Sequence, residues 1–192
     1  DHRDLHSFPT RRSSDLVHME AWFENAEALC LLTGNSSGNL ELLDFDFGAE
    51  LFVPWSDAVE AQNPDLWNRL VIETSQSGGM HVVYRCADPV SGNMKLAQRR
   101  IECESPDEIA IGGKTCKPRK DADGKWHVII TLIETRGEGG LFLCSPTPGY
   151  KIVQGDLASL PILTAEERTL LLEAAWSLNE YVPAPVSAPV PS

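Results

Sequence analysis

The sequence predicts a mixed α+β domain that spans roughly residues 17–182 and is rich in strands in its middle. Short apolar runs of strand length recur between polar turns. Two stretches, 54–70 and 164–180, have helical character instead. No run approaches the roughly 18 apolar residues of a membrane span, so no membrane association is expected. A hydrophobic content of 42% is enough for one packed core.

The domain is expected to begin with two strands. The run "ALCLLTG" at 28–34 ends in glycine, "NSSGN" at 35–39 is a turn by composition, and "LELLDFD" at 40–46 is the next strand. Short spacing across a turn is typical of a hairpin. We therefore expect 28–34 and 40–46 to pair with each other.

A helical stretch and two further strands follow. Residues 54–70 are expected to form a helix that Pro64 breaks or restarts, because proline cannot donate the helical hydrogen bond. The runs "VIETS" at 71–75 and "HVVYRC" at 81–86 are expected to be strands joined by "QSGGM".

The second half contains three predicted strands and one helix. The strands are 108–113 and 126–134, which flank a basic stretch, and 140–146, which follows a tight glycine link. A helix is expected over 164–180, because Thr164 and Glu167 have the spacing of a capping box. Its predicted apolar face consists of Leu170, Leu171, Ala174 and Leu178.

The charge distribution bears on possible partners. A net charge of −12 disfavours strong nucleic-acid binding, because phosphate contacts need Lys and Arg. However, half of the 16 basic residues lie between Lys95 and Lys125. They form either a solvated hairpin face or a surface that follows a phosphate backbone. In the second interpretation Lys117, Arg119 and Lys120 are the DNA-binding candidates.

Both ends of the sequence differ in composition from the domain. The part "FPTRRSSDL" looks like a translated sequencing adapter, so residues 1–16 are expected to be foreign and without regular structure. Residues 183–192 resemble a Pro/Ala-rich linker, and we expect a truncated chain with a further domain beyond it. The start lacks a secretory signal, and the odd number of cysteines, 5, fits a reduced, cytoplasmic protein.

The first chemical motif is the pair Asp44 and Asp46 at the end of an apolar strand. Residues i and i+2 of a strand point to the same side, so the two carboxylates are expected to lie together. Like charges this close are stabilised by a cation, and Mg²⁺ or Mn²⁺ suits carboxylates that act with substrate phosphates. The alternative is a strand end at which both side chains turn to water.

The second motif is "TSQSGGMH" at 74–81. Amides of Gly78 and Gly79 and the Ser77 hydroxyl could hold phosphate oxygens, because glycine permits a close backbone approach. His81 would be a hydrogen-bond donor or proton carrier beside them. The alternative is a plain hairpin turn with His81 as an ordinary strand residue.

The third motif is "LIETRGEGG" at 132–140. Glu134 ends an apolar strand, and Arg136 shares its side if the strand continues by two residues. A carboxylate and a guanidinium suit a metal and a triphosphate respectively. The alternative is an exposed strand end followed by a glycine turn with Glu138 in solvent.

Taken in this order, the three motifs resemble the primase-polymerase domain of the archaeo-eukaryotic primase superfamily. This is the N-terminal domain of bifunctional DNA primase/polymerases of phages, plasmids and other mobile elements. The similarity covers about 30–180, from "LLTGNSSGNLELLDFD" through "TSQSGGMHVVYR" to "LIETRGEGGLFLCSPTPGY". It implies a modified RRM-like mixed or antiparallel sheet with helices and a second small α/β unit. The active site would lie in the cleft between the two.

The resemblance also implies residue roles. The metal ligands would be Asp44, Asp46 and Glu134, and the catalytic set adds His81. The nucleotide-binding residues would be Ser77, Gly78, Gly79, His81 and Arg136. The third acid of the family is often aspartate, so Glu134 departs from the pattern and Glu138 is the alternative ligand.

The implied activity is template-dependent nucleotidyl transfer with two Mg²⁺ or Mn²⁺ ions. The implied partners are a single-stranded DNA template, NTPs or dNTPs, and a helicase or ATPase domain beyond the linker. Whether ribonucleotides or deoxyribonucleotides are preferred stays open at this stage.

The sequence leaves two alternative functions. The domain could bind nucleotide or DNA without catalysis, or it could be a metal-dependent D-x-D sugar-nucleotide transferase, which gives the second and third motifs no role. Zinc is not expected, because the chain has no closely spaced cysteine pair. The residues considered for zinc are Cys86, Cys103, Cys116 and His127.

Overall fold

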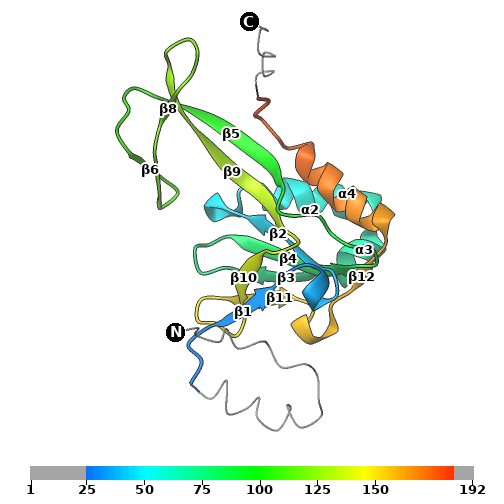
Figure 1. Cartoon of the computed structure of the whole chain (residues 1–192). Helices are drawn as coiled ribbons and strands as arrows, with labels where there is room; N and C mark the ends of the chain where they lie inside the picture. The colour runs from blue at the N-terminus through cyan, green and yellow to red at the C-terminus, as the bar shows by residue number, and fades with distance from the viewer. Residues whose placement is uncertain (1–24, 184–192) are drawn as a thin grey trace, which may run out of the picture.

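The structure, a computed structural model, describes residues 25–183 (Figure 1). The predicted foreign segment 1–16 and residues 184–192 of the predicted linker lie outside the described residues. The described part is mixed α+β, as predicted, and consists mostly of antiparallel strands. None of its helices is long and apolar enough to cross a membrane.

An eight-stranded sheet forms the centre of the domain. Its strand order is β11-β3-β4-β2-β9-β5, with β12 beside β4 and β8 beside β9, and only β12 pairs in parallel. The strands are β2 (Leu40–Phe45), β3 (Val71–Thr74), β4 (Met80–Cys86), β5 (Lys95–Cys103), β8 (Arg119–Lys120), β9 (Trp126–Arg136), β11 (Lys151–Gln154) and β12 (Ile162–Leu163). The four predicted strands 40–46, 71–75, 81–86 and 126–134 are thereby confirmed, while β5, β8, β11 and β12 were not foreseen.

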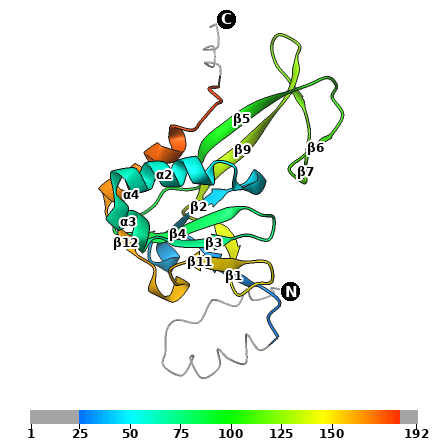
Figure 2. The same ribbon diagram turned by 180° about the vertical axis from the view of Figure 1, so that it is seen from behind.

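The helices α2 (Phe52–Gln62), α3 (Pro64–Arg69) and α4 (Ala165–Trp176) lie on one side of this sheet (Figure 2). The predicted break at Pro64 is confirmed, because Pro64 begins α3 after Asn63, whose side chain accepts a hydrogen bond from the Leu66 amide. The capping box of Thr164 and Glu167 is also present. The buried residues of α4 are Leu171, Leu172, Ala174 and Ala175, so its buried face is shifted slightly from the predicted one.

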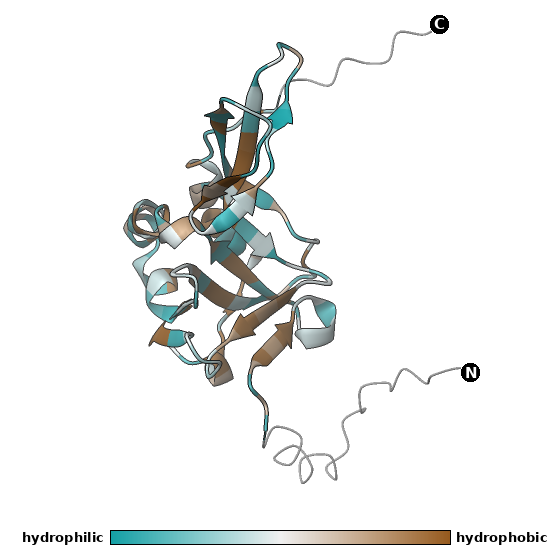
Figure 3. Cartoon of the chain, turned by 90° about the vertical axis from the view of Figure 1, so that its left-hand side faces the viewer, coloured by the Kyte–Doolittle hydropathy of each residue, from teal (hydrophilic) through white to brown (hydrophobic). Residues whose placement is uncertain are grey.

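The two faces of β2 enter different cores, because successive side chains of a strand alternate. Leu43 and Phe45 pack in the large cluster with the helices. Leu40 and Leu42 belong to a smaller cluster with Val83 on the opposite face. The small sheet of β1 (Leu29–Leu32) and β10 (Leu141–Cys144) contributes the remaining members of this second core. Apolar residues concentrate in these strands (Figure 3).

The predicted hairpin between 28–34 and 40–46 is wrong. β1 pairs with β10, and its only link to β2 is an isolated bridge between Gly34 and Leu40. The reason is that both edges of β2 are already taken, by β4 on one side and β9 on the other. Strand β2 is therefore a central strand, and β1 pairs outside the main sheet.

Strands β5 and β9 continue past the sheet as a long two-stranded arm (Figure 1). The segment between them forms β6 (Ile109–Ile111) and β7 (Lys114–Cys116), which pair as a hairpin, and then β8. The predicted strand 108–113 is shorter than expected, because Gly112 and Gly113 have positive φ and form the hairpin turn. The basic stretch of the sequence is thus the arm and its hairpin.

Candidate active site

Four ionisable side chains form one row across the sheet. Glu73 on β3 is in register with His81 on β4, and His81 with Asp44 on β2. Asp44 is in turn in register with Glu134 on β9. Residues directly opposite in neighbouring antiparallel strands project from the same face. Four segments that are far apart in sequence therefore present their polar groups side by side, on the face away from the helices.

Two of the predicted metal ligands, Asp44 and Glu134, belong to this row, and the third, Asp46, lies beside them. Asp44, Asp46 and Glu134 each offer an oxygen, and the three oxygens lie within 4.8 Å of one another. The side chains are 15%, 17% and 16% exposed, so they are accessible to a small ion yet largely removed from water. Oxygen ligands of this kind suit Mg²⁺ or Mn²⁺.

Two cationic side chains contact these carboxylates. Arg136 lies on the same side as Glu134, as predicted, and its Nη2 is 2.6 Å from Glu134 Oε1 and 3.2 Å from Asp44 Oδ2. Lys114 reaches over from the β6–β7 hairpin, with its Nζ 2.6 Å from Asp46 Oδ1 and 5.1 Å from the centre of the Phe47 ring. Three carboxylates thus share two cations, and negative charge remains in excess.

The electrostatics of the row reflect this excess. Burial raises the pKa of Asp44 above its ordinary value, and the nearby Asp46 adds to the increase, while His81 and Arg136 oppose it. Burial likewise raises the pKa of Glu134, with Asp44 and Asp46 acting in the same direction against Arg136. Both carboxyls are therefore harder to ionise than in water, and a divalent cation would relieve that cost.

His81 is held firmly between two acids. Its Nδ1 is 2.8 Å from Glu73 Oε1, and its Nε2 is 3.6 Å from Asp44 Oδ1. Glu73 is completely buried, and its second carboxylate oxygen accepts a hydrogen bond of 3.0 Å from the Ser145 amide. The ring of Tyr150 lies 5.9 Å from that of His81. Glu73 thus orients the imidazole so that Nε2 faces the carboxylate cluster.

The turn between β3 and β4 contains the predicted phosphate-binding residues. The Gly78 amide donates to the Ser75 carbonyl, and the Gly79 amide donates to Ser75 Oγ at 3.0 Å. Both amides therefore have partners inside the turn, and the Ser77 hydroxyl lies 3.3 Å from that of Ser75. A side chain at Gly79 would lie 2.5 Å from the Phe45 carbonyl, so this glycine brings the turn close to the end of β2.

Glu138, the alternative third ligand, lies elsewhere. Its Oε2 accepts a hydrogen bond of 2.7 Å from the Asn35 amide and therefore closes the turn that follows β1. The structure brings Glu134, and not Glu138, beside Asp44 and Asp46.

The remaining candidates lie on the arm. Lys117 and Arg119 border a small cavity there, whereas Lys120 rests on the Trp126 ring, with its Nζ 5.5 Å from the ring centre. Among residues 25–183, the only group of three or more His, Cys, Asp or Glu side chains close enough to share a metal is the acidic one. The cysteines considered for zinc are free thiols, and burial raises the pKa of Cys86 to about 12.

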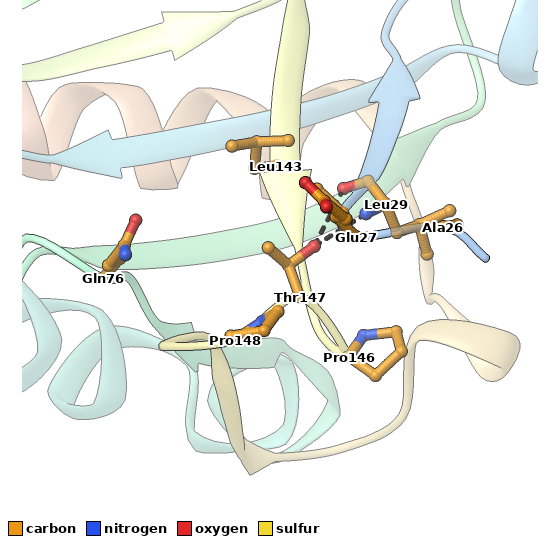
Figure 4. A pocket seen from close by; sticks show the side chains of 9 residues that line it. Ala26, Glu27, Leu29, Gln76, Leu143, Pro146, Thr147 and Pro148 are labelled. Atoms are coloured by element: carbon orange, nitrogen blue, oxygen red, sulfur yellow. Dashed lines mark hydrogen bonds between the residues drawn. The ribbon is translucent and has the colours of Figure 1, made fainter.

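A larger hollow of about 970 Å³ is lined by other residues than those of this row (Figure 4). It is bordered mainly by apolar groups, including Leu143, Pro146 and Pro148. Its hydroxyl group, Thr147 Oγ1, already accepts a hydrogen bond of 2.7 Å from the Leu29 amide. Its one ionisable side chain among the described residues is Glu27, whereas the row brings four ionisable side chains together and is the better candidate for a reaction site.

Two residues of the site, Glu73 and Lys114, were not predicted from the sequence. Glu73 is an acid within the apolar run 71–75, and an ionisable residue in a buried strand is itself a signal of a polar partner. Lys114 was seen only as part of a basic stretch, and nothing in the sequence indicates that the hairpin folds back onto Asp46.

Comparison with protein-family models found no match, and comparison with curated proteins found no significant relative.

Proposed function

We propose that the chain is a metal-dependent nucleotidyltransferase that synthesises primers or DNA on a single-stranded template from nucleoside triphosphates. The observation that carries the proposal is the group of Asp44, Asp46 and Glu134, with oxygens within 4.8 Å of one another on adjacent strands. The order of the three motifs in the sequence supports the same class. The proposal includes an RRM-like arrangement of the main sheet, with the reaction in a cleft beside a second small α/β unit.

Asp44, Asp46 and Glu134 are the residues that would hold Mg²⁺ or Mn²⁺. Their fit rests on the donor set, which is all oxygen, and on a negative charge that Arg136 and Lys114 only partly balance. When bound, two such ions activate the attacking 3′-hydroxyl and stabilise the leaving pyrophosphate. The protein otherwise contributes positioning and electrostatic stabilisation.

The cationic groups of the row serve the triphosphate. Arg136 has five N–H donors and uses one nitrogen for its two carboxylate contacts, so other donors can bind phosphate oxygens. In its imidazolium form, His81 donates through Nδ1 to Glu73 and keeps Nε2–H for a phosphate oxygen or a proton transfer. The Ser77 hydroxyl is a further donor at the same edge of the sheet.

The catalytic proposal is tested by primer synthesis and extension on single-stranded DNA with Mg²⁺ or Mn²⁺. We expect Asp44→Ala, Asp46→Ala and Glu134→Ala each to lower the rate at least about 100-fold, equivalent to about 2.7 kcal/mol in the barrier. Glu60→Ala removes an exposed carboxylate from α2 and is the matched control. A wild-type protein that binds triphosphate with Mg²⁺ but extends no primer would contradict the enzymatic proposal and favour a non-catalytic domain.

The role of His81 is tested separately by triphosphate binding. Hydrogen bonds to charged groups contribute about 1.5–3 kcal/mol, so His81→Ala should weaken the affinity roughly tenfold or more. Glu73→Gln keeps the packing but removes the charge that orients the ring, and a smaller loss is expected. Equal affinity in wild type and His81→Ala, with both folded by circular dichroism, would remove His81 from the site.

A further inference from the structure

A polar cavity lies on the arm, with a volume of about 330 Å³. It is lined by β5, β9 and the stretch from the end of β7 to the start of β8. Its polar lining residues are Lys95, Gln98, Cys116, Lys117, Arg119 and His127. Within residues 25–183 no carboxylate borders it, although the chain as a whole carries a net charge of −12.

The cations around this cavity differ from the paired basic residues of the arm, although Lys120 and Lys125 outside the cavity also have no carboxylate within 4.0 Å among the described residues. Arg99, Arg100 and Lys114 each contact a carboxylate. In contrast, Lys95, Lys117 and Arg119 have no carboxylate within 4.0 Å in the part of the chain that the structure describes. Lys95 acts electrostatically on Glu134, but the positive charges of Lys117 and Arg119 have no paired carboxylate at this concave surface, which favours an anionic ligand.

His127 supplies an independent observation. Its side chain borders the cavity and is 9% exposed, yet its buried Nδ1 has no hydrogen-bond partner. A buried polar atom without a partner costs about 1–3 kcal/mol, so this wall of the cavity contains a polar side chain whose hydrogen-bonding capacity is not fully used. Arg119 is in register with His127 across β8 and β9, and the two side chains are thus neighbours.

The acidic group closest to His127 by register does not neutralise this surface. Glu102 on β5 is opposite His127, but its side chain is 65% exposed and its oxygen lies 4.0 Å from Arg100. Cys116 and His127 do not make a metal site either, because the only metal-competent group among the described residues is the acidic one on the sheet. The cavity is therefore suited to an anion.

We propose that this cavity is a binding site for a phosphate group. Arginine and lysine are the preferred partners of phosphate oxygens, and a histidine nitrogen adds a directional donor. Lys95 is in register with Glu134, so the cavity continues from the edge of the acidic row toward the arm. The phosphate belongs either to the backbone of a nucleic-acid strand or to a free anion such as pyrophosphate. The proposal needs neither metal nor turnover and is independent of nucleotidyl transfer.

The test follows the His127 ring resonances by NMR, without divalent metal, during separate titrations with pyrophosphate and with a single-stranded oligodeoxynucleotide. Saturable shifts with the oligonucleotide identify a backbone phosphate, and saturable shifts with pyrophosphate alone identify a free anion. Either result supports the site. No saturable shift with either probe would overturn it.

Variants distinguish a defined pocket from general charge attraction. Binding of the probe should weaken at least about tenfold in Arg119→Met and His127→Phe, measured by calorimetry. Lys125→Met makes the same charge change as Arg119→Met at an exposed position outside the cavity and should stay within about twofold of wild type. Equal losses in Arg119→Met and in Lys125→Met would refute the pocket. Arg119 is exposed, so its variant serves even if His127→Phe does not fold.

Discussion

Strand β2 carries two acidic sites on its opposite faces. On the helix face, Glu41 is completely buried and receives two bonds from Arg168, at 2.6 and 2.8 Å, and one of 3.0 Å from the Tyr84 hydroxyl. On the other face, Asp44 is one of three clustered carboxylates, and its contact to Arg136 is longer, at 3.2 Å. The same strand thus holds one acid that is fully paired and another that is not.

The difference separates structural from functional burial of charge. The charge of a buried carboxylate is neutralised by a bidentate arginine, so no ligand is required to balance it. Asp44 and Glu134 have raised pKa values because burial and neighbouring acids outweigh the available cations. An arrangement that costs free energy in the folded protein is expected where a ligand supplies the missing charge.

The largest expected effect on stability comes from breaking the ion pair of Glu41 and Arg168. Arg168→Met leaves Glu41 buried without its cation and should lower the free energy of unfolding by about 3–5 kcal/mol in urea titrations. Arg69→Met is the matched control, because Arg69 pairs with Glu167 at the surface, and it should cost less than about 1 kcal/mol. Equal losses of unfolding free energy in the two variants would show that the buried pair of Glu41 and Arg168 stabilises the fold no more than a surface ion pair.

An intermediate effect on stability is expected when a divalent cation binds to the cluster of Asp44, Asp46 and Glu134. Mg²⁺ or Mn²⁺ should raise the thermal midpoint of the wild type, since a ligand at about 100 times its Kd stabilises the folded state by about 2.7 kcal/mol. Asp44→Ala/Asp46→Ala should abolish this increase, whereas Arg168→Met, although less stable, should retain it. An increase that persists in the double variant would place the ion elsewhere.

The smallest expected effect is a gain in the free energy of unfolding, opposite in sign to the loss expected for Arg168→Met. Because the folded-state pKa of Asp44 is raised, the carboxyl destabilises the fold fully above that pKa and not at all below its unfolded value. Asp44→Asn should therefore increase the free energy of unfolding at pH 7 by about 0.5–2 kcal/mol, the usual range of stabilising substitutions. The gain should disappear as the pH is lowered through the carboxyl range. A loss of stability at pH 7 would make Asp44 a structural acid like Glu41.

Much of the local structure could be predicted from the sequence. The strand that contains Asp44, the helix break at Pro64 and the capping box of Thr164 depend on neighbouring residues alone, so they were predicted correctly, although the strand ends at Phe45 and Asp46 directly follows it. The common side of Glu134 and Arg136 follows from strand alternation in the same way. Strands β5 and β11 were missed, because their polar side chains hide the apolar alternation that marks a half-buried strand.

The sequence by itself thus determined the apolar strands and the helices, and which polar side chains two residues apart point the same way. The tertiary structure alone decided that β1 pairs with β10, that Glu134 joins Asp44 across two strands, and that Glu73 fixes His81 from a third. It also decided that Glu41 is neutralised by Arg168 while Asp44 is not. The physical reason is that alternation along a strand is a local property, whereas neighbours across a sheet are chosen by packing between segments distant in sequence.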